Sequence, residues 1–438
     1  MNNDYLEMMQ GILKDEYSLY LEALKDESYR GFRVNSLKID DITFFKETNW
    51  EEEKVDWASH SYYYKEDLTV GYSKEFLSGL IYMQEPSASF PVEVLDPKPG
   101  EIVLDLCAAP GSKSTQIAEK MNHEGLLIAN EIDSNRAQIL KENIMKCGAS
   151  NVIVLSSNPK DLEGCFHEYF DAILVDAPCS GEGMFRKEKQ AIDDWSIEHV
   201  KSCAIRQSHI LDSAYSLLMP GGRLVYSTCT FNVNENEQTI DQFLTKYPDM
   251  KILPIDIKGG HSGIHINHST EYARRIYPMD KGEGQFICLL QKDGNRHERK
   301  ESYLKGESIP KGLLDDIHAL IMKPFPYYYF YQNKLYGGTY PFIQVKPCHL
   351  IRHQCYIGEV KKGRFVYSHD FFMNAYTGFR NIISLNNEEI HSFLHGEAIK
   401  YKVDKGIYPV GFQNHIIGYS KADGTYLKNK FPKGLRIK

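Results

Sequence analysis

The chain has 438 residues, of which 42% are hydrophobic and 25% charged, the composition of an ordinary globular protein of about two to four domains. No apolar run approaches about 18 residues and no basic-then-apolar leader is present, so we expect neither a membrane span nor a secretory signal. Nine cysteines without a CxxC pair argue against a disulfide framework and against a structural zinc site, and they favour reduced thiols in the cytoplasm. The net charge of −8 argues against a nucleic-acid partner unless basic residues are clustered.

The beginning of the chain carries helical and strand patterns. Residues 4–25 place apolar side chains at spacings of three and four, which predicts an amphipathic helix. Val34, Leu37 and Ile39 follow as predicted strand positions. These features predict a small α+β domain over residues 1–85.

From residue 86 to residue 293 the chain alternates buried apolar runs with helical patterns. This alternation is typical of a doubly wound α/β fold with a parallel sheet. In such a sheet, ligands bind beyond the carboxyl ends of the strands. The predicted strands are 102–106, 126–130, 152–155, 172–175, 223–226 and 286–290, and the predicted helices are 114–121, 134–147, 205–219 and 234–247.

The last third of the chain differs from the core in its residue pattern and in its charge. A polar linker begins near residue 294, and short aromatic-rich or glycine-punctuated segments after it predict a β-rich region with a small barrel or sandwich. Residues 1–60 carry seven Lys/Arg against fourteen Asp/Glu, whereas residues 399–438 carry nine Lys/Arg against two Asp. This asymmetry indicates a basic platform that attracts phosphate backbones, or alternatively a solvated basic tail.

The loop after the first core strand is a candidate cofactor site. Small residues let the backbone approach a ligand closely, and the helix that follows offers free N–H groups. Glu131, 20 residues beyond Gly111, is placed to accept hydrogen bonds from a ribose diol. A dinucleotide site or a plain tight turn would look similar, although the loop is not GxGxxG. The loop consists of Cys107, Ala108, Ala109, Pro110, Gly111, Ser112 and Lys113.

Two predicted core strands are each followed by a cysteine, Cys179 in DAPCSG and Cys229 in STCT. Parallel strands bring their carboxyl ends to one edge of a sheet, so both thiols should lie at one cleft with Asp176. A thiolate that adds to carbon 6 of cytosine activates carbon 5 for methylation, an acid can hydrogen-bond the ring at N3, and a second group assists elimination. These three residues suit the three roles, and Lys113 is a candidate for the positive charge that stabilises a thiolate. The other seven cysteines are expected to be buried as small hydrophobic side chains.

Several segments resemble the signature motifs of the Nop/Sun family of S-adenosylmethionine-dependent RNA cytosine-5 methyltransferases. The similarity spans about residues 32–290, and the paired PCSG and STCT motifs are its most specific part. The segments are VLDLCAAPGSKSTQIAEKM, ANEIDSNR, LVDAPCSGEGMFRK and YSTCTFNVNENE, with FRVNSLK and YMQEPSASFPVEVLDPKPGE upstream and RRIYPMDKGEGQFICLL downstream.

The resemblance implies roles for individual residues. Cys229 would be the nucleophile, and Cys179 would aid product release. No metal is implied. S-adenosylmethionine would be held by residues 107–113 together with Glu131, Asn158 and Asp176.

Two positions depart from the family pattern. Asn158 stands where much of the family has an acid that contacts the adenine amino group, and its amide oxygen could make the same contact. Met279 and Gln285 stand where the family often has a histidine and an aromatic residue, which changes the expected RNA contacts.

The end of the chain, from GEAIKYK to GLRIK, is similar to the PUA-like RNA-binding tail of the bacterial RsmF-like subgroup. That subgroup methylates cytosines in 16S rRNA and has a connecting module between core and tail. The resemblance therefore implies a cytoplasmic monomer that binds 16S rRNA or the small ribosomal subunit, and neither DNA nor a membrane. The expected domains are 1–85 (α+β, RNA-binding), 86–293 (methyltransferase core), 294–370 (linker and connecting module) and 371–438 (PUA-like).

Three other functions stay open from the sequence. The motifs do not separate rRNA from tRNA as the substrate, because flanking domains choose the RNA. A DNA cytosine methyltransferase also uses a Pro-Cys, but there that thiol attacks. An assembly factor that binds RNA without catalysis is the third alternative.

A few residues outside the core motifs are further candidates. Three histidines between residues 261 and 268 resemble a metal-binding face, but nearby glycines favour a loop. Arg33 and Asn35 could touch an RNA backbone or be ordinary strand-edge residues. The tyrosines of 327–329 could stack on bases or pack in a core. The histidines are His261, His265 and His268.

Overall fold

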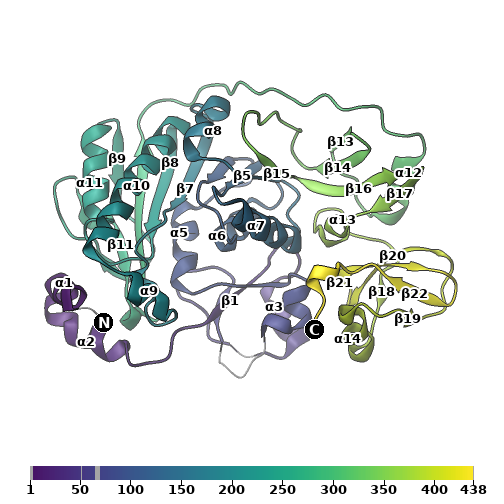
Figure 1. The fold of residues 1–438 in the computed structure, drawn as a ribbon, viewed down its shortest axis with the longest axis horizontal. Helices are drawn as coiled ribbons and strands as arrows, with labels where there is room; N and C mark the ends of the chain where they lie inside the picture. The colour runs from purple at the N-terminus through teal and green to yellow at the C-terminus, as the bar shows by residue number, and fades with distance from the viewer. Residues whose placement is uncertain (1–2, 51, 65–69, 438) are drawn as a thin grey trace.

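The computed structural model describes residues 3–50, 52–64 and 70–437 (Figure 1). Parts of the predicted terminal domains, 1–85 and 371–438, therefore lie outside the description. Within the described ranges the strands form four sheets, of which the largest has ten strands. No helix in these ranges is long and apolar enough to cross a membrane.

The ten-stranded sheet contains five neighbouring parallel strands in the order β8-β7-β4-β5-β6. The chain runs outward from β4 to β6 on one side and from β7 to β8 on the other, so the strand order reverses between β4 and β7. Ligands of doubly wound folds bind at this reversal point. The parallel strands are β4 (Ile102–Asp105), β5 (Leu126–Asn130), β6 (Val152–Leu155), β7 (Phe170–Asp176) and β8 (Leu218–Thr228). Beyond β8 the sheet continues with the antiparallel strands β12 (Gln285–Lys292), β11 (Arg274–Ile276) and β10 (His261–Ser262). β12 also pairs with β9 (Met250–Leu253).

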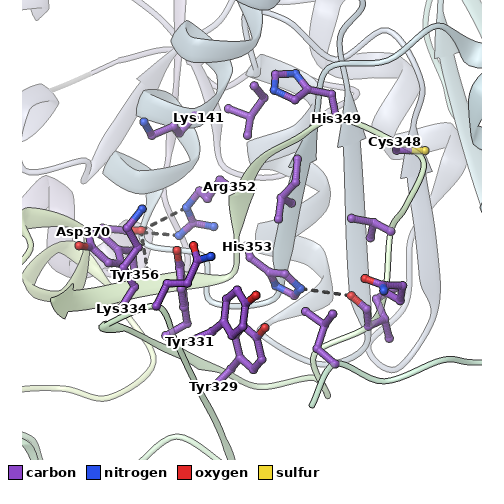
Figure 2. Close-up of a pocket in the computed structure, with 18 of the residues that line it drawn as sticks. Lys141, Tyr329, Tyr331, Lys334, Cys348, His349, Arg352, His353, Tyr356 and Asp370 are labelled. Carbon is purple, nitrogen blue, oxygen red and sulfur yellow. Dashed lines mark hydrogen bonds and ion pairs between the residues drawn. The ribbon is translucent and has the colours of Figure 1, made fainter. Parts of the chain in front are cut away.

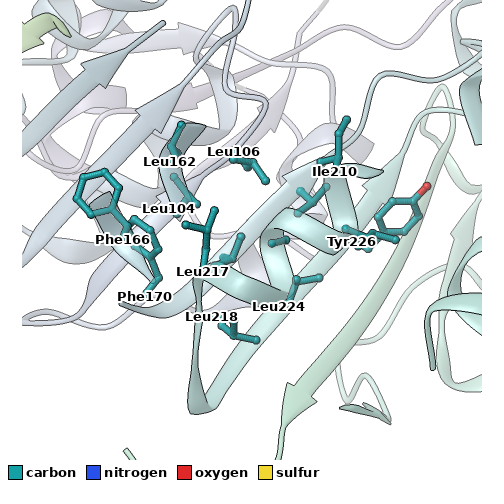
Figure 3. Close-up of a cluster of buried hydrophobic side chains, with 14 of the residues drawn as sticks. Leu104, Leu106, Leu162, Phe166, Phe170, Ile210, Leu217, Leu218, Leu224 and Tyr226 are labelled. Atoms are coloured by element: carbon teal, nitrogen blue, oxygen red, sulfur yellow. The ribbon is translucent and has the colours of Figure 1, made fainter. Parts of the chain in front are cut away.

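Helices cover both faces of this sheet, as the doubly wound prediction requires. On one face, apolar side chains of α6 and α7 pack against alternate strand residues in one buried cluster. On the other face, α8 and α10 bury leucine and phenylalanine side chains against the remaining strand positions (Figure 3). The helices are α5 (Phe90–Leu95), α6 (Ser112–Met121), α7 (Ser134–Cys147), α8 (Pro159–Phe166), α9 (Lys189–Asp194), α10 (Ile197–Leu217) and α11 (Glu237–Lys246).

The helix predicted over residues 4–25 is interrupted. Lys14 has a φ of 49°, and a short turn there separates α1 (Asn3–Leu13) from α2 (Tyr17–Ala23). Both helices bury apolar side chains against the core, where Tyr5 packs on Phe185. The predicted apolar face is present, but it belongs to two helices.

The N-terminal sheet has the order β2-β1-β3. Leu37 and Ile39 were wrong as strand positions, because the side chain of Asn35 accepts the N–H of Leu37 and begins a turn directly after β1. Asn35 and Arg33 are both buried, so the hypothesis that they touch an RNA backbone is also wrong. The elements are β1 (Gly31–Val34), α3 (Asp41–Thr48), β2 (Ser61–Tyr63), α4 (Lys74–Leu77) and β3 (Ile81–Met83).

Arg33 instead joins the N-terminal domain to the helix that follows the cofactor loop. Its guanidinium, 1% exposed, donates to both carboxylate oxygens of Glu119 at 2.7 and 3.0 Å and to Thr115 at 2.7 Å. It also donates to the carbonyl of Ser112, the first residue of α6, at 3.2 Å. This contact fixes the start of α6 relative to the N-terminal sheet.

Replacing Arg33 with methionine should therefore destabilise the protein. The change leaves the buried carboxylate of Glu119 without its partner, which typically costs about 3–5 kcal/mol. Urea unfolding should show this loss, and the double variant R33M/E119L should recover most of it. Equal instability of the single and double variants would mean that packing, rather than charge pairing, makes Arg33 necessary.

The predicted connecting module contributes a strand to the core. β15 (Leu350–His353) pairs antiparallel with β6 and extends the ten-stranded sheet. The remaining strands form a separate four-stranded sheet in the order β13-β14-β16-β17. Its elements are α12 (Leu313–Leu320), β13 (Tyr327–Tyr331), β14 (Lys334–Gly338), β16 (Cys355–Lys361) and β17 (Arg364–Tyr367).

The C-terminal region folds as a five-stranded sheet and packs against the N-terminal sheet. Phe32 and Phe44 share one buried cluster with Val410 and Phe412. His415 and Glu47 form an ion pair of 2.7 Å across the same boundary. The elements are α13 (His369–Met373), β18 (Ile383–Ser384), α14 (Asn387–His395), β19 (Ile399–Lys400), β20 (Gly406–Phe412), β21 (His415–Ala422) and β22 (Tyr426–Asn429).

Candidate active site

The two cysteines lie side by side at the carboxyl ends of neighbouring strands. β7 ends at Asp176, which pairs in register with Ser227 of β8. The loops after these strands carry Cys179 and Cys229, whose sulfur atoms are 3.2 Å apart. Both cysteines line a cleft of about 1160 Å³, and both are half-buried.

The two thiols affect each other's ionisation. The hydrogen bond with Cys229, together with burial, raises the pKa of Cys179 well above its ordinary value. Either sulfur could donate its S–H to the other across this contact. Two thiols at this distance can stabilise one thiolate between them, because a hydrogen bond to the charged form stabilises it.

Asp176 is the centre of a polar network beside the thiols. It accepts hydrogen bonds from Lys113 Nζ at 2.7 Å, Ser227 Oγ at 2.7 Å and Gln285 Nε2 at 3.3 Å. Burial alone would lower the pKa of Lys113, but the negative charge of Asp176 raises it overall, and Cys229 adds to the effect. Lys113 is thus a positive charge near both Asp176 and Cys229.

Buried glutamates fix the two cysteine loops to each other, and the sequence motifs alone did not indicate this role. Glu235 accepts from the backbone N–H of Ser180 at 3.0 Å and from Gln207 at 2.7 Å. Glu182, in the loop after Cys179, accepts from the backbone N–H of Phe231 at 2.6 Å, in the loop after Cys229. Both glutamates therefore connect the two cysteine loops, and Glu235 also connects them to α10 through Gln207. These contacts hold the sulfur atoms in place.

The predicted cofactor loop divides into residues that face the cleft and residues that shape the turn. Cys107 and Ala109 line the cleft. Ala108 is buried and donates to the carbonyl of Asn130 at 2.8 Å, while Pro110 is exposed. Gly111 has a φ of 112°, in the region that favours glycine, directly before Ser112 and Lys113 begin α6.

Glu131 and Asn158 also line this cleft. Glu131 is buried, and one of its oxygens accepts the N–H of Asp133 at 3.0 Å, which fixes the carboxylate. The amide oxygen of Asn158 accepts the N–H of Lys160 at 3.0 Å and caps α8. Ile132, which the sequence patterns did not single out, is 61% exposed and lines the cleft with them.

Asp105, at the end of β4, is a buried carboxylate behind the cofactor loop. One oxygen accepts from Ser114 Oγ at 2.6 Å, and the other has no hydrogen-bond partner in the described part of the chain. Burial raises the pKa of Asp105 to about 7. The folded state therefore disfavours the ionised carboxylate.

Replacing Asp105 with asparagine should stabilise the protein at alkaline pH. Because the folded pKa lies above the unfolded value of 3.8, stability falls as pH rises from about 4 to about 7. At pH 8 the variant should gain about 2–4 kcal/mol, and at pH 5 much less. Thermal unfolding across pH measures this, with D293N, at an exposed aspartate, as the matched control. A pH-independent difference would contradict the assignment.

The three candidate metal-binding histidines pair with separate carboxylates. Within the described residues, no group of three or more potential ligands could hold a metal ion. The pairs are His261 with Asp280 at 3.1 Å, His265 with Glu271 at 2.7 Å and His268 with Asp241 at 2.7 Å. These histidines therefore stabilise the loop after β10 rather than form one site.

Three family models match the chain. The model described as 16S rRNA methyltransferase RsmB/F matches residues 92–291, and the N-terminal domain of 16S rRNA methyltransferase RsmF matches residues 1–86. The PUA domain of methyltransferase RsmF matches residues 380–437. The chain belongs to the RsmB/F family of methyltransferases. Its N-terminal and C-terminal regions have the domain types of the RsmF members.

Curated relatives of the RsmB/F family give the same result. The ribosomal RNA small subunit methyltransferase F of Serratia proteamaculans is 40% identical over 301 residues, which cover 66% of this chain and 62% of the relative. The protein of the same name from Escherichia coli O139:H28 is 42% identical over 285 residues, which cover 62% of this chain and 59% of the relative. The chain thus matches about three fifths of these relatives' length.

Solved structures share the fold. A methyltransferase homologue from Pyrococcus horikoshii is 32% identical, with a TM-score of 0.60, and the match covers 67% of this chain and 95% of the homologue. The NSun6 protein of the same organism, crystallised with SFG, has a TM-score of 0.59 at 21% identity and covers 67% of this chain and 99% of its own. The RsmB/F core is therefore a Rossmann-like methyltransferase fold with a mixed sheet.

Proposed function

We propose that this protein methylates carbon 5 of cytosine in 16S rRNA, using S-adenosylmethionine. The observation that carries the proposal is the 3.2 Å contact between the sulfur atoms of Cys179 and Cys229 in a cleft that also contains Asp176. Carbon 5 of cytosine is a weak nucleophile, so its methylation needs covalent activation of the ring. A thiol pair at an open cleft provides one thiol to attack and one to assist release.

Cys229 is the nucleophile in this proposal. Its thiolate bonds to carbon 6 of the ring, and the electron pair of the 5–6 double bond then makes carbon 5 nucleophilic. Lys113 supplies nearby positive charge that supports the thiolate, and the sulfur of Cys179 lies within hydrogen-bond distance of it. After methyl transfer, Cys179 as a thiolate accepts the carbon 5 proton, and the electron pair of that C–H bond re-forms the 5–6 double bond and expels the sulfur of Cys229 as a thiolate.

Asp176 positions the ring in this scheme. Its carboxylate is held by Lys113, Ser227 and Gln285, so its direction is fixed before the substrate arrives. The carboxylate can accept a hydrogen bond from the exocyclic amino group at the N3 edge of cytosine, which would orient the ring for thiolate addition. Gln285, at a position where the family often has an aromatic residue, contributes through Asp176.

The donors and acceptors that line the cleft fit S-adenosylmethionine, which supplies the methyl group when bound. The buried carboxylate of Glu131 suits a ribose diol, and exposed Ile132 beside it offers apolar surface for a base. The amide oxygen of Asn158 accepts one hydrogen bond at α8 and has a second lone pair for the adenine amino group. Cys107 to Ser112 would supply backbone contacts at the start of α6.

The flanking regions support RNA as the substrate. Lysines in the loops next to the C-terminal sheet, such as Lys402, Lys405 and Lys430, are exposed, which suits a phosphate backbone. The proposed division of the chain is 1–85, 86–293, 294–370 and 371–438, with RNA binding in the first and last parts and chemistry in the second. We further propose that the protein acts as a monomer in the cytoplasm.

Methyl transfer from labelled cofactor distinguishes the candidate substrates. Naked 16S rRNA, assembled small subunits and tRNA should be compared under identical conditions, with 5-methylcytosine identified by mass spectrometry. Incorporation into 16S rRNA, free or assembled, is the expected result. Incorporation into tRNA alone would favour the tRNA methyltransferase, and none into any RNA would favour the non-catalytic assembly factor.

A further inference from the structure

A second large hollow, of about 1430 Å³, lies between the core and the four-stranded sheet (Figure 2). One side is formed by β15 and α7, and the other by β13, β14 and β16. It shares no lining residue with the thiol cleft. We call this hollow the tyrosine groove, after the residues on its sheet side.

Tyrosines form a continuous row across the sheet. Tyr329 of β13 pairs with Tyr336 of β14, which pairs with Tyr356 of β16, and the ring centroids are 6.2 and 5.3 Å apart. Tyr331 lies two residues along β13, on the same face, with its ring roughly parallel to that of Tyr329. Phe330 points to the opposite face, into the buried core of the module.

This row is more than core packing. Tyr331 is 45% exposed, and Tyr303, which also lines the groove, is 56% exposed. Of the tyrosine run considered in the sequence, Tyr328 packs on Phe325 in the core of the module, whereas Tyr329 faces the groove. Core packing is therefore confirmed for Tyr328, and base stacking stays a prediction for Tyr329.

Basic side chains line the same groove. Within the described part of the chain, none of its four lysines forms an ion pair with a carboxylate. Of the two acids that line it, Asp370 pairs with buried Arg352, and Glu359 pairs with Lys361 and lies opposite Lys334 in the strand register. In a chain of net charge −8, this leaves a local excess of positive charge. The four are Lys141, Lys305, Lys334 and Lys346.

The groove adjoins the thiol cleft at the end of β6. His349, which lines the groove, accepts from the backbone N–H of Ser156 at 2.8 Å and donates its own to Ser157 Oγ at 2.9 Å. The next residue, Asn158, lines the cleft. The groove therefore lies next to the part of the cleft that is assigned to the cofactor, across the end of β6.

We propose that the tyrosine groove binds single-stranded RNA that flanks the target nucleotide. Bases stack on the tyrosine rings, and phosphates pair with the lysines, which is how proteins hold unpaired strands without reading their sequence. Unpaired RNA is required because a duplex hides the faces of its bases. The proposal rests on the proposed function only in taking RNA as the substrate.

Binding of an unstructured RNA of about 12 nucleotides to the full chain, followed by fluorescence anisotropy, tests the groove. Y331A should weaken binding about five- to tenfold through the loss of one stacking surface, and Y331F should restore it to within about twofold. The matched control is Y327A, because Tyr327 is 42% exposed on the same strand but does not line the groove.

Salt dependence tests the lysines separately. The double variant K305A/K334A should lower the slope of log affinity against log salt by roughly 1.4, and K311A, at an exposed lysine outside the groove, should leave it unchanged. RNA carrying 5-iodouridine should photocrosslink to the peptide that contains Tyr329 and Tyr331.

The outcomes separate this inference from the proposed function. If the groove variants bind RNA as tightly as the unaltered chain, or if Y327A weakens binding equally, the groove is not an RNA site, whatever the methylation assay gives. Such a result would leave a protein partner as the occupant. If the groove variants lose binding while no RNA is methylated, RNA binding by the groove is supported and the proposed methylation is contradicted.

Discussion

Replacing Cys179 with alanine should trap the protein on its RNA as a covalent complex. Cys229 can still attack carbon 6, and the methyl group can still be transferred, but the group that assists elimination is gone. Turnover should fall by about 10²–10⁴-fold, the usual contribution of a positioned proton-transfer group. A denaturing gel with labelled RNA and S-adenosylmethionine should show a slow-migrating complex in nearly stoichiometric amount.

The matched control is C165A. Cys165 is also half-buried, but it does not line the thiol cleft, so this variant should turn over normally and leave no complex. Mass spectrometry of the trapped nucleotide should find a base that is already methylated, because the block follows methyl transfer. A C179A variant that forms no complex, paired with a C229A variant that does, would reverse the roles of the two thiols. That pattern is the one expected of a DNA cytosine methyltransferase, in which the Pro-Cys thiol attacks.

The position of the thiol pair was predictable because its cause is local. A short apolar run predicts a buried strand, and parallel strands end at one edge, so residues just past β7 and β8 must meet there. The sequence therefore indicated that Asp176, Cys179 and Cys229 would lie together. The cofactor loop and Glu131 followed from the same rule, applied to β4 and β5.

The supporting contacts were not predictable in this way. Gln285 comes from an antiparallel strand more than 100 residues after Asp176, and no local pattern reveals that its amide reaches that carboxylate. Glu182 and Glu235 look like ordinary polar residues of loops until the fold buries them. Arg33 was misassigned for the same reason, since the sequence does not show that Glu119 lies opposite it.

The tyrosine groove was only partly predictable from the sequence. Alternation along β13 indicates that Tyr329 and Tyr331 share a face, but not whether that face is covered. Whether this face is covered depends on β15, which pairs with the core sheet and leaves a hollow beside β13 and β14. Strand pairing between distant segments is the information that a single sequence lacks.

Replacing Cys229 with alanine should abolish methyl transfer and leave no covalent complex. Without a nucleophile at carbon 6 the ring is not activated, and a loss of at least about 10⁴-fold is expected when a covalent nucleophile is removed. C229S should be nearly as inactive, because a hydroxyl is far less ionised than a thiol at neutral pH. Labelled-cofactor transfer to 16S rRNA measures both variants.

Three further measurements separate loss of chemistry from loss of structure. Affinity for S-adenosylmethionine, measured by calorimetry, should stay within about twofold, because Cys229 is not among the residues assigned to the cofactor. The melting temperature should also change little, since the half-buried thiol borders an open cleft. The double variant C179A/C229A should form no complex, which shows that the adduct trapped by C179A requires Cys229. If C229A still methylated RNA at an appreciable rate, activation of cytosine would have to come from another residue of the cleft, and the 3.2 Å thiol contact would no longer explain the reaction.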